Sequence, residues 1–154
     1  MTGKLYMIPT TLGGEQVNDV IPVTVQQLIT ELRYFIVEDI KSARRYLRRV
    51  DRNFPIDDSV FYELNKRTDN KNLLSYLKPA KDGHNIGVIS EAGCPGVADP
   101  GAEMVALAHE IGIRVVPLVG PSSILLALMG SGFSGQEFTF HGYLPKERKE
   151  RIRL

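Results

Sequence analysis

Residues 90–101 have the residue types of a ligand-binding loop. They include three glycines, two prolines and two carboxylates, and they lie between the apolar run 86–89 and a helical pattern over residues 102–111. A short apolar run predicts a buried strand. An ordinary turn from strand to helix needs only one glycine and one capping residue. The richer composition favours a loop that approaches a ligand at the carboxyl end of a parallel strand.

Individual positions in this loop have predicted roles. Gly93, Gly96 and Gly101 permit positive φ and leave room for a ligand against the backbone. Asp99 is placed to cap the following helix, with Pro100 at the first helical position. A ligand-contacting role for Asp99 stays open beside this capping role.

Two further loops have a similar position. Residues 9–14 follow the strand pattern 4–8, and residues 120–123 follow the strand pattern 113–119. Each loop is a weak signal alone, and a plain turn is the simpler interpretation of the first. Because the carboxyl ends of parallel strands meet at one edge of a sheet, three such loops together predict a crevice there.

A basic helix is predicted over residues 39–50. Its apolar positions at helical spacing are Ile40, Ala43, Leu47 and Val50. Its remaining surface carries the cations Lys41, Arg44, Arg45, Arg48 and Arg49, with Arg52 just beyond. Such a surface is either a solvated helix face or a phosphate-binding surface.

Composition excludes several classes of protein. The 154 residues are 43% hydrophobic and 24% charged with a net charge of +1, which is typical of a globular domain without a strong overall field. The single cysteine, Cys94, permits no internal disulfide and argues against a cysteine metal cluster. The sequence shows no membrane-spanning run, signal peptide or Ser-His-Asp pattern, and its histidines are scattered. We therefore expect a cytoplasmic protein with no metal site.

The order of elements predicts an α/β fold with a mainly parallel sheet and helices on both faces. Strand patterns also occur at residues 34–37 and 59–64, and helical patterns at residues 23–32, 69–77 and 124–129. The last of these is apolar all round, which predicts a helix that is buried or lies under a second domain. A glycine-rich linker at residues 130–136 precedes an alternating, strand-like segment at 138–144. We therefore predict an α/β domain over residues 1–132, with residues 133–154 forming a linker and the first strand of a truncated second domain.

The loops taken together resemble the tetrapyrrole methylase family, which uses S-adenosylmethionine. The similarity is greatest to the branch that methylates a cytidine ribose 2′-hydroxyl in small-subunit ribosomal RNA. It is carried by Ser90-Glu91-Ala92-Gly93-Cys94-Pro95, Asp99-Pro100-Gly101, Val115-Val116-Pro117 and Gly120-Pro121-Ser122-Ser123. Glu38-Asp39, Glu63 with Asn65, and residues 138–145 match more loosely. The branch usually has aspartate and threonine at the positions of Glu91 and Cys94.

This resemblance implies an S-adenosylmethionine-dependent methyltransferase of two domains, with the cofactor in the cleft between them. It implies that this chain is an N-terminal domain, inactive alone, whose partners are ribosomal RNA or the small-subunit particle and a second copy in a homodimer. The expected cofactor contacts are Pro9, Glu91, Ala92, Gly93, Asp99, Pro121 and Ser122. The expected RNA contacts are Arg44, Arg45, Arg48 and Arg49. No catalytic residue is assigned, because Glu38 and Glu63 are equal candidates for a general base.

Other functions stay open at this stage. Within the same family the acceptor is alternatively a tetrapyrrole or another small molecule. A dinucleotide-binding oxidoreductase domain is a second alternative, and residues 130–135 match its GxGxxG pattern. That match follows an apolar helix instead of a strand, so its context is wrong. A non-catalytic binding module is the third alternative.

Overall fold

The computed structural model describes residues 1–65, 67–68 and 72–152. The chain divides into two compact units, Met1–Ser122 and Ser123–Leu154. The sequence predicted a boundary after residue 132, and that domain assignment remains a prediction.

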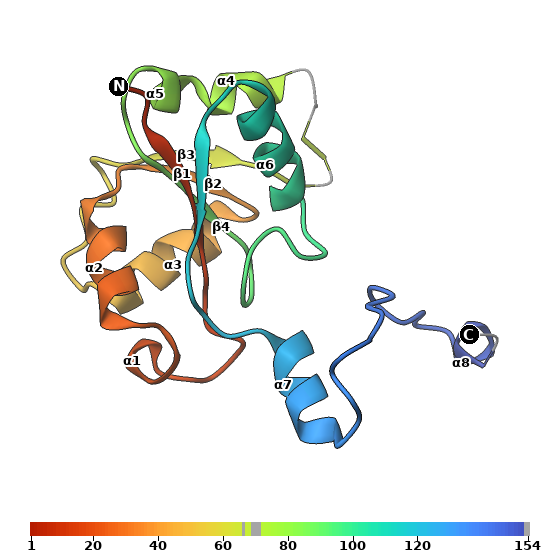
Figure 1. Cartoon of the computed structure of the whole chain (residues 1–154). Coiled ribbons are helices and arrows are strands. Elements are labelled where there is room, and N and C mark those ends of the chain that lie inside the picture. Colours follow the sequence, from red (N-terminus) through yellow and green to blue (C-terminus); the bar gives the residue numbers. More distant parts are fainter. Residues whose placement is uncertain (66, 69–71, 153–154) are drawn as a thin grey trace. The chain divides into compact units, whose positions relative to one another are not determined.

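The first unit contains a five-stranded sheet in the order β3-β2-β4-β1-β5 (Figure 1). The strands are β1 (Lys4–Ile8), β2 (Tyr34–Val37), β3 (Val60–Glu63), β4 (Ile86–Ile89) and β5 (Arg114–Pro117). The pairs β1–β4, β1–β5, β2–β3 and β2–β4 are all parallel. The predicted α/β fold with a parallel sheet is therefore confirmed, and β5 is shorter than the strand predicted over residues 113–119.

Helices cover both faces of this sheet (Figure 1). The first unit has the helices α1 (Val17–Val20), α2 (Val23–Glu31), α3 (Ile40–Val50), α4 (Leu73–Tyr76), α5 (Lys78–Lys81) and α6 (Gly101–Glu110). In β1, Tyr6 and Ile8 pack in one core with α1, α2 and α3, whereas Leu5 and Met7 pack in the other with α4, α5 and α6. This alternation follows from the two-residue period of a strand.

The helix boundaries follow local capping chemistry. Asp39 precedes α3, and its carboxylate accepts a 2.7 Å hydrogen bond from the Ser42 N–H. This bond, helped by the charges of Lys41 and Arg45, holds the pKa of Asp39 below its ordinary value. Residues 69–71 of the helix predicted over residues 69–77 lie outside the described residues. The four-residue helices α1 and α5 were not predicted, because they are too short to show a helical period.

The chain reverses direction across the sheet between β3 and β4. The connections from β1 to β2 and from β2 to β3 contain α1, α2 and α3, while those from β3 to β4 and from β4 to β5 contain α4, α5 and α6. The neighbouring strands β1 and β4 therefore send their following segments to opposite faces. In open α/β sheets, such a switch point at the carboxyl ends of the strands is where ligands bind.

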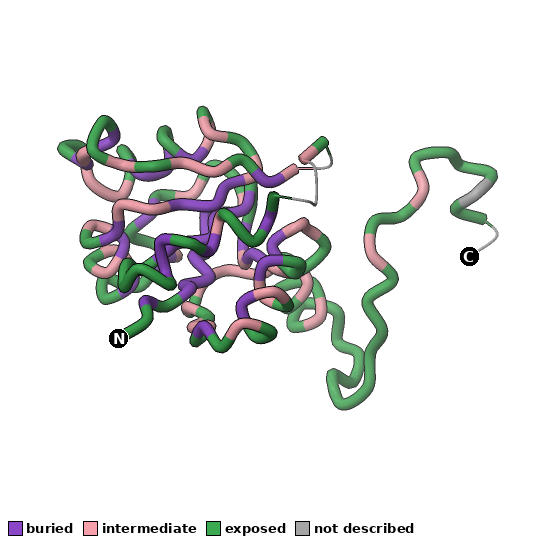
Figure 2. Tube along the Cα trace, turned by 90° about the horizontal axis from the view of Figure 1, so that it is seen from above, coloured by how far each residue is buried: buried purple, intermediate pink, exposed green. Residues whose placement is uncertain are grey.

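The second unit is mostly exposed (Figure 2). It contains α7 (Ser123–Ser131) and α8 (Arg148–Arg151). No residue of α7 is buried, so burial of the apolar helix at residues 124–129 within this chain is not observed, and its place under a second domain stays a prediction. The strand predicted at residues 138–144 does not form within the described residues, and its place as the first strand of a second domain stays a prediction. Alternation supplies only propensity, and no described segment pairs with these residues to form a ladder.

Within the described residues, no helix combines the length and the apolar character needed to cross a membrane.

Candidate functional site

Three loops meet at the carboxyl edge of the sheet. The Thr10 N–H donates a 2.9 Å hydrogen bond to the Gly93 carbonyl, which joins the loop after β1 to the loop after β4. The Cys94 thiol lies 3.3 Å from the Pro121 carbonyl oxygen and 3.6 Å from that of Gly120, so it joins the loop after β4 to the loop after β5. The predicted convergence of the three loops is therefore observed.

Glycines permit this close approach. A Cβ on Gly120 would lie 2.1 Å from the Pro9 Cβ, so only glycine fits against that proline. Gly93 has a φ of +68°, and a Cβ there would lie 3.1 Å from the Pro121 carbonyl oxygen. A substitution at Gly93 would therefore combine backbone strain with crowding. Pro9 itself is buried, so this predicted cofactor contact also supports the third loop.

Asp99 holds the long loop together. Its two carboxylate oxygens each lie 2.9 Å from the Gly96 nitrogen, and one accepts a 2.7 Å bond from the Gly101 N–H. The prediction that Asp99 is the N-cap residue with Pro100 at the first helical position is wrong, because α6 begins at Gly101 and its N-cap residue is Pro100. The Asp99 carboxylate instead accepts from the first N–H of the helix. Gly96 has positive φ as predicted, but Gly101 does not. A Cβ on Gly101 would lie 2.7 Å from the Asp99 carboxylate, which explains why glycine stands there.

Cys94 is a hydrogen-bond donor and not a nucleophile. Burial raises the pKa of its thiol, which keeps it protonated near neutral pH. A protonated thiol donates to the carbonyls of Gly120 and Pro121. No pattern in the sequence indicated this link between the loops.

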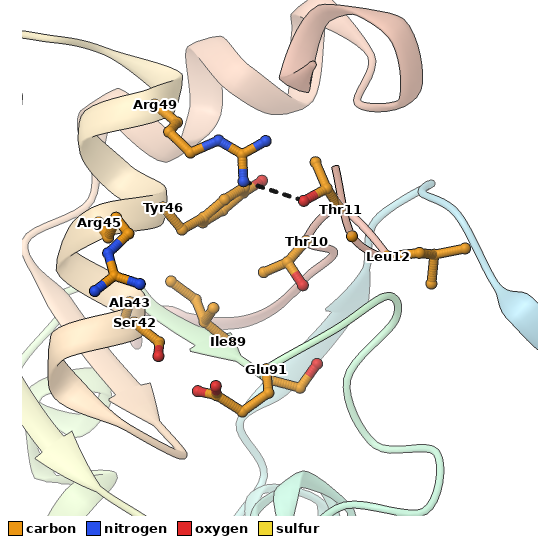
Figure 3. A pocket seen from close by; sticks show the side chains of 12 residues that line it. Thr10, Thr11, Leu12, Ser42, Ala43, Arg45, Tyr46, Arg49, Ile89 and Glu91 are labelled. Atoms are coloured by element: carbon orange, nitrogen blue, oxygen red, sulfur yellow. Dashed lines mark hydrogen bonds between the residues drawn. The ribbon is translucent and has the colours of Figure 1, made fainter. Parts of the chain in front are cut away.

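A pocket of about 190 Å³ lies between α3 and the loops after β1 and β4 (Figure 3). Its lining is rich in hydroxyl and charged groups and consists of Thr10, Thr11, Leu12, Gly13, Ser42, Ala43, Arg45, Tyr46, Arg49, Ile89, Ser90 and Glu91. Of the predicted cofactor contacts, Glu91 lines it, whereas Ala92, Gly93, Pro121 and Ser122 belong to the neighbouring junction of the loops. Ala92 and Glu91 are exposed, and Pro121 and Ser122 are half-buried.

Tyr46 fixes α3 against the first loop. Its hydroxyl donates a 2.8 Å hydrogen bond to the Pro9 carbonyl in a buried position. Burial raises the pKa of Tyr46 well above its ordinary value, although the charge of Arg49 opposes the shift. The apolar spacing in the sequence predicted a buried face of α3 without Tyr46, which the structure adds to that face.

The four predicted RNA-binding arginines lie on two sides of α3. Arg45 and Arg49 line the pocket. The guanidinium of Arg44 instead lies 5.3 Å from the centre of the Phe61 ring, and that of Arg48 donates a 3.0 Å bond to the Arg52 carbonyl. Residues four apart lie on the same side of a helix and adjacent residues do not, so Arg45 and Arg49 share one side and Arg44 and Arg48 share another. The structure therefore does not bring the four cations together at one place.

The two candidates for a general base border a different hollow. Glu38 directly follows β2, and Glu63 is the last residue of β3. Both line a broad hollow together with Asp39, Asn65 and Tyr76. The Glu63 carbonyl accepts hydrogen bonds from the hydroxyls of Tyr76 and Thr68, while its side chain is exposed. Neither carboxylate lines the pocket beside α3.

The dinucleotide-type pattern at residues 130–135 has no suitable context. It begins within α7 and follows that helix instead of a strand. It lies in the second unit, outside the unit that contains the sheet. The prediction that a helix, and not a strand, precedes this match is confirmed.

Comparison with known proteins identifies relatives along nearly the whole chain. The chain is 31% identical over 152 residues to a protein of Synechocystis named ribosomal RNA small subunit methyltransferase I. The aligned residues make up 99% of this chain and 52% of that protein. Proteins of the same name from Bacillus subtilis and Escherichia coli O157:H7 are 32% and 30% identical, each over 97% of this chain. This chain is related to these ribosomal RNA methyltransferases.

The predicted resemblance to the tetrapyrrole methylase family, in its ribosomal RNA branch, is confirmed by these relatives. The chain spans about half the length of the relatives it matches, 52% of the Synechocystis protein and 48% of the Bacillus protein. No family model matches the chain.

Proposed function

We propose that the protein containing this chain is an S-adenosylmethionine-dependent methyltransferase that acts on the 2′-hydroxyl of a cytidine ribose in small-subunit ribosomal RNA. The observation that carries the proposal is the meeting of three loops at the switch point of the sheet, in a chain related along 99% of its length to a protein named as a ribosomal RNA methyltransferase. The RNA or its small-subunit particle as partner, a homodimer and a cytoplasmic location belong to this proposal.

The residues at the loop junction fit such a cofactor. Glu91 and Ala92 are exposed at the edge of the junction, and the glycines at 93 and 120 let its loops pack closely. Among the described residues the buried Thr10 hydroxyl has no hydrogen-bond partner, and a ligand oxygen would satisfy it. We propose that Glu91, Ala92, Gly93, Pro121 and Ser122 contact the cofactor, while Pro9 and Asp99 hold the loops that do so.

S-adenosylmethionine supplies a methyl group on a sulfonium, already activated for in-line displacement. The chain therefore needs mainly to hold cofactor and acceptor in line. The Thr10 to Gly93 hydrogen bond and the Cys94 to Pro121 contact fix the three loops against one another. This rigidity is the contribution of this unit to positioning.

Transfer of a labelled methyl group tests the proposal. The whole protein is incubated with small-subunit ribosomal RNA and S-adenosylmethionine labelled in the methyl group, and the RNA is digested to nucleosides. We expect label in 2′-O-methylcytidine. Label in a tetrapyrrole but not in RNA would favour the small-acceptor alternative, and cofactor binding without turnover would favour the non-catalytic module.

Residues 1–154 provide a second arm of the same experiment. The relatives extend over about twice this length. We propose that residues 1–154 alone adopt the α/β fold but do not transfer methyl groups. Turnover by these residues comparable with that of the whole protein would contradict this part of the proposal.

A further inference from the structure

The pocket beside α3 has the composition of an oxyanion site. Its charged lining groups are the guanidiniums of Arg45 and Arg49 on one side and the carboxylate of Glu91 on the other (Figure 3). With two cations and one carboxylate, the lining carries a net positive charge. Guanidinium groups bind phosphate and carboxylate oxygens through paired N–H donors.

The donors of this pocket are only partly used within the protein. Arg49 donates to the Thr11 hydroxyl at 3.3 Å and to the Glu15 carbonyl at 2.6 Å, so its position is fixed. Arg45 donates no hydrogen bond to any described residue, although its charge acts on Asp39. An exposed guanidinium with unused donors beside a fixed one is available to a ligand.

A buried hydroxyl supplies independent evidence for a ligand. The Thr10 side chain lines the pocket and is 4% exposed, and its Oγ1 has no hydrogen-bond partner in the part of the chain that the structure describes. A buried polar group without a partner costs about 1–3 kcal/mol. A ligand oxygen that bonded to this hydroxyl would recover that cost. The pocket volume of about 190 Å³ admits roughly six waters at the volume each takes in the liquid, which is room for a phosphate-sized group.

We propose that this pocket binds a backbone phosphate of the acceptor RNA through Arg45, Arg49 and the Thr10 hydroxyl, and that Arg44 and Arg48 take no part. This inference rests on the proposed function. An oxyanion in the pocket has a second possible source, the carboxylate of the cofactor's amino-acid part. The RNA phosphate is favoured because Ala92, Gly93, Pro121 and Ser122, the other cofactor contacts proposed above, do not line the pocket.

Two double variants with equal charge changes test the assignment. Arg45→Gln with Arg49→Gln removes the pocket pair, and Arg44→Gln with Arg48→Gln removes the other pair of the same helix. Binding of a single-stranded ribosomal RNA fragment to the whole protein is measured by fluorescence anisotropy at several salt concentrations. The pocket variant should bind RNA at least tenfold more weakly, with a logarithmic salt slope shallower by about 0.7 for one lost phosphate contact. The control variant should keep the wild-type slope.

Further measurements separate the possible failures. Arg45→Gln alone removes no hydrogen bond within the described chain. It should also weaken RNA binding and make the salt slope shallower, while its free energy of unfolding stays that of wild type. Calorimetry with S-adenosylhomocysteine should give the wild-type affinity in every variant. Equal effects of the two double variants would overturn the inference. Lost S-adenosylhomocysteine affinity with unchanged RNA binding would overturn it in favour of the cofactor carboxylate.

The wild-type protein distinguishes this inference from the proposed function. If wild type methylates RNA and the Arg45→Gln variant binds RNA normally, only the phosphate site is wrong. If wild type binds S-adenosylhomocysteine but neither binds nor methylates RNA, the RNA acceptor is wrong as well.

Discussion

Replacing Gly120 by alanine should separate two of the loops that form the site. The added Cβ would lie 2.1 Å from the Pro9 Cβ and 2.4 Å from its Cγ. Carbon atoms pack at about 3.5–4.0 Å, so the two loops must move apart by roughly 1.5 Å. Pro9 resists this movement because it is buried and its carbonyl accepts the Tyr46 hydroxyl at 2.8 Å.

The cost of this crowding is measurable. Overpacking of a packed position typically costs about 1–3 kcal/mol. We therefore expect Gly120→Ala to lower the free energy of unfolding in urea by about that amount. The displaced loop no longer has its normal position against the loop after β4. S-adenosylhomocysteine should therefore bind at least tenfold more weakly, which corresponds to about 1.4 kcal/mol of binding free energy.

Gly14→Ala is the matched control. Gly14 lies in the loop after β1, a Cβ there would meet no atom within 4 Å, and its φ is not positive. This variant should have the wild-type free energy of unfolding and the wild-type affinity for S-adenosylhomocysteine. If Gly120→Ala also behaves like wild type in both assays, the close packing of Pro9 on Gly120 does not shape the site, and the reasoning is refuted.

Three further predictions concern the residues that hold the loops. Tyr46→Phe removes the buried bond to Pro9 and should lower the free energy of unfolding by about 1–2 kcal/mol. Burial raises the Tyr46 pKa from 10.0, so above pH 10 the native state keeps a proton that the unfolded chain loses. The free energy of unfolding should therefore fall more steeply above pH 10 in wild type than in Tyr46→Phe, and equal pH profiles would contradict this. Asp99→Ala leaves the Gly96 and Gly101 N–H groups without their acceptor and should destabilise by about 1–3 kcal/mol in urea, whereas Asp99→Asn, which keeps one oxygen, should lose less. Because partial burial raises the pKa of Cys94, iodoacetamide should alkylate it at pH 8 more slowly in native than in denatured protein, and equal rates would contradict a thiol held as a donor between the loops.

The sequence predicted the parts of the fold that depend on local pattern. Apolar runs at β1, β2 and β4 and helical spacing in α2, α3 and α6 are local properties, and those elements lie within a residue or two of their predicted bounds. The strand predicted at residues 138–144 is absent because a strand also needs a pairing partner, which alternation does not report. The helices α1 and α5 were missed because four residues carry no period.

The site was predictable at the level of loops but not of side chains. Glycine and proline content located the three loops at the strand ends. The hydroxyl of Thr10, the Tyr46 bond to Pro9 and the thiol contact of Cys94 depend on residues far apart in the sequence, so no local pattern contains them. The split of the arginines follows from helical geometry, but which pair faces the pocket depends on where α3 packs on the sheet.

Calorimetry with two competing ligand classes tests most directly whether the three loops form an S-adenosylmethionine site. The whole protein is titrated with S-adenosylhomocysteine and, separately, with NAD under the same conditions. The meeting of the loops after β1, β4 and β5 predicts binding of S-adenosylhomocysteine and much weaker or no binding of NAD. Binding of NAD without binding of S-adenosylhomocysteine would contradict the assignment of the site and favour a dinucleotide-binding domain.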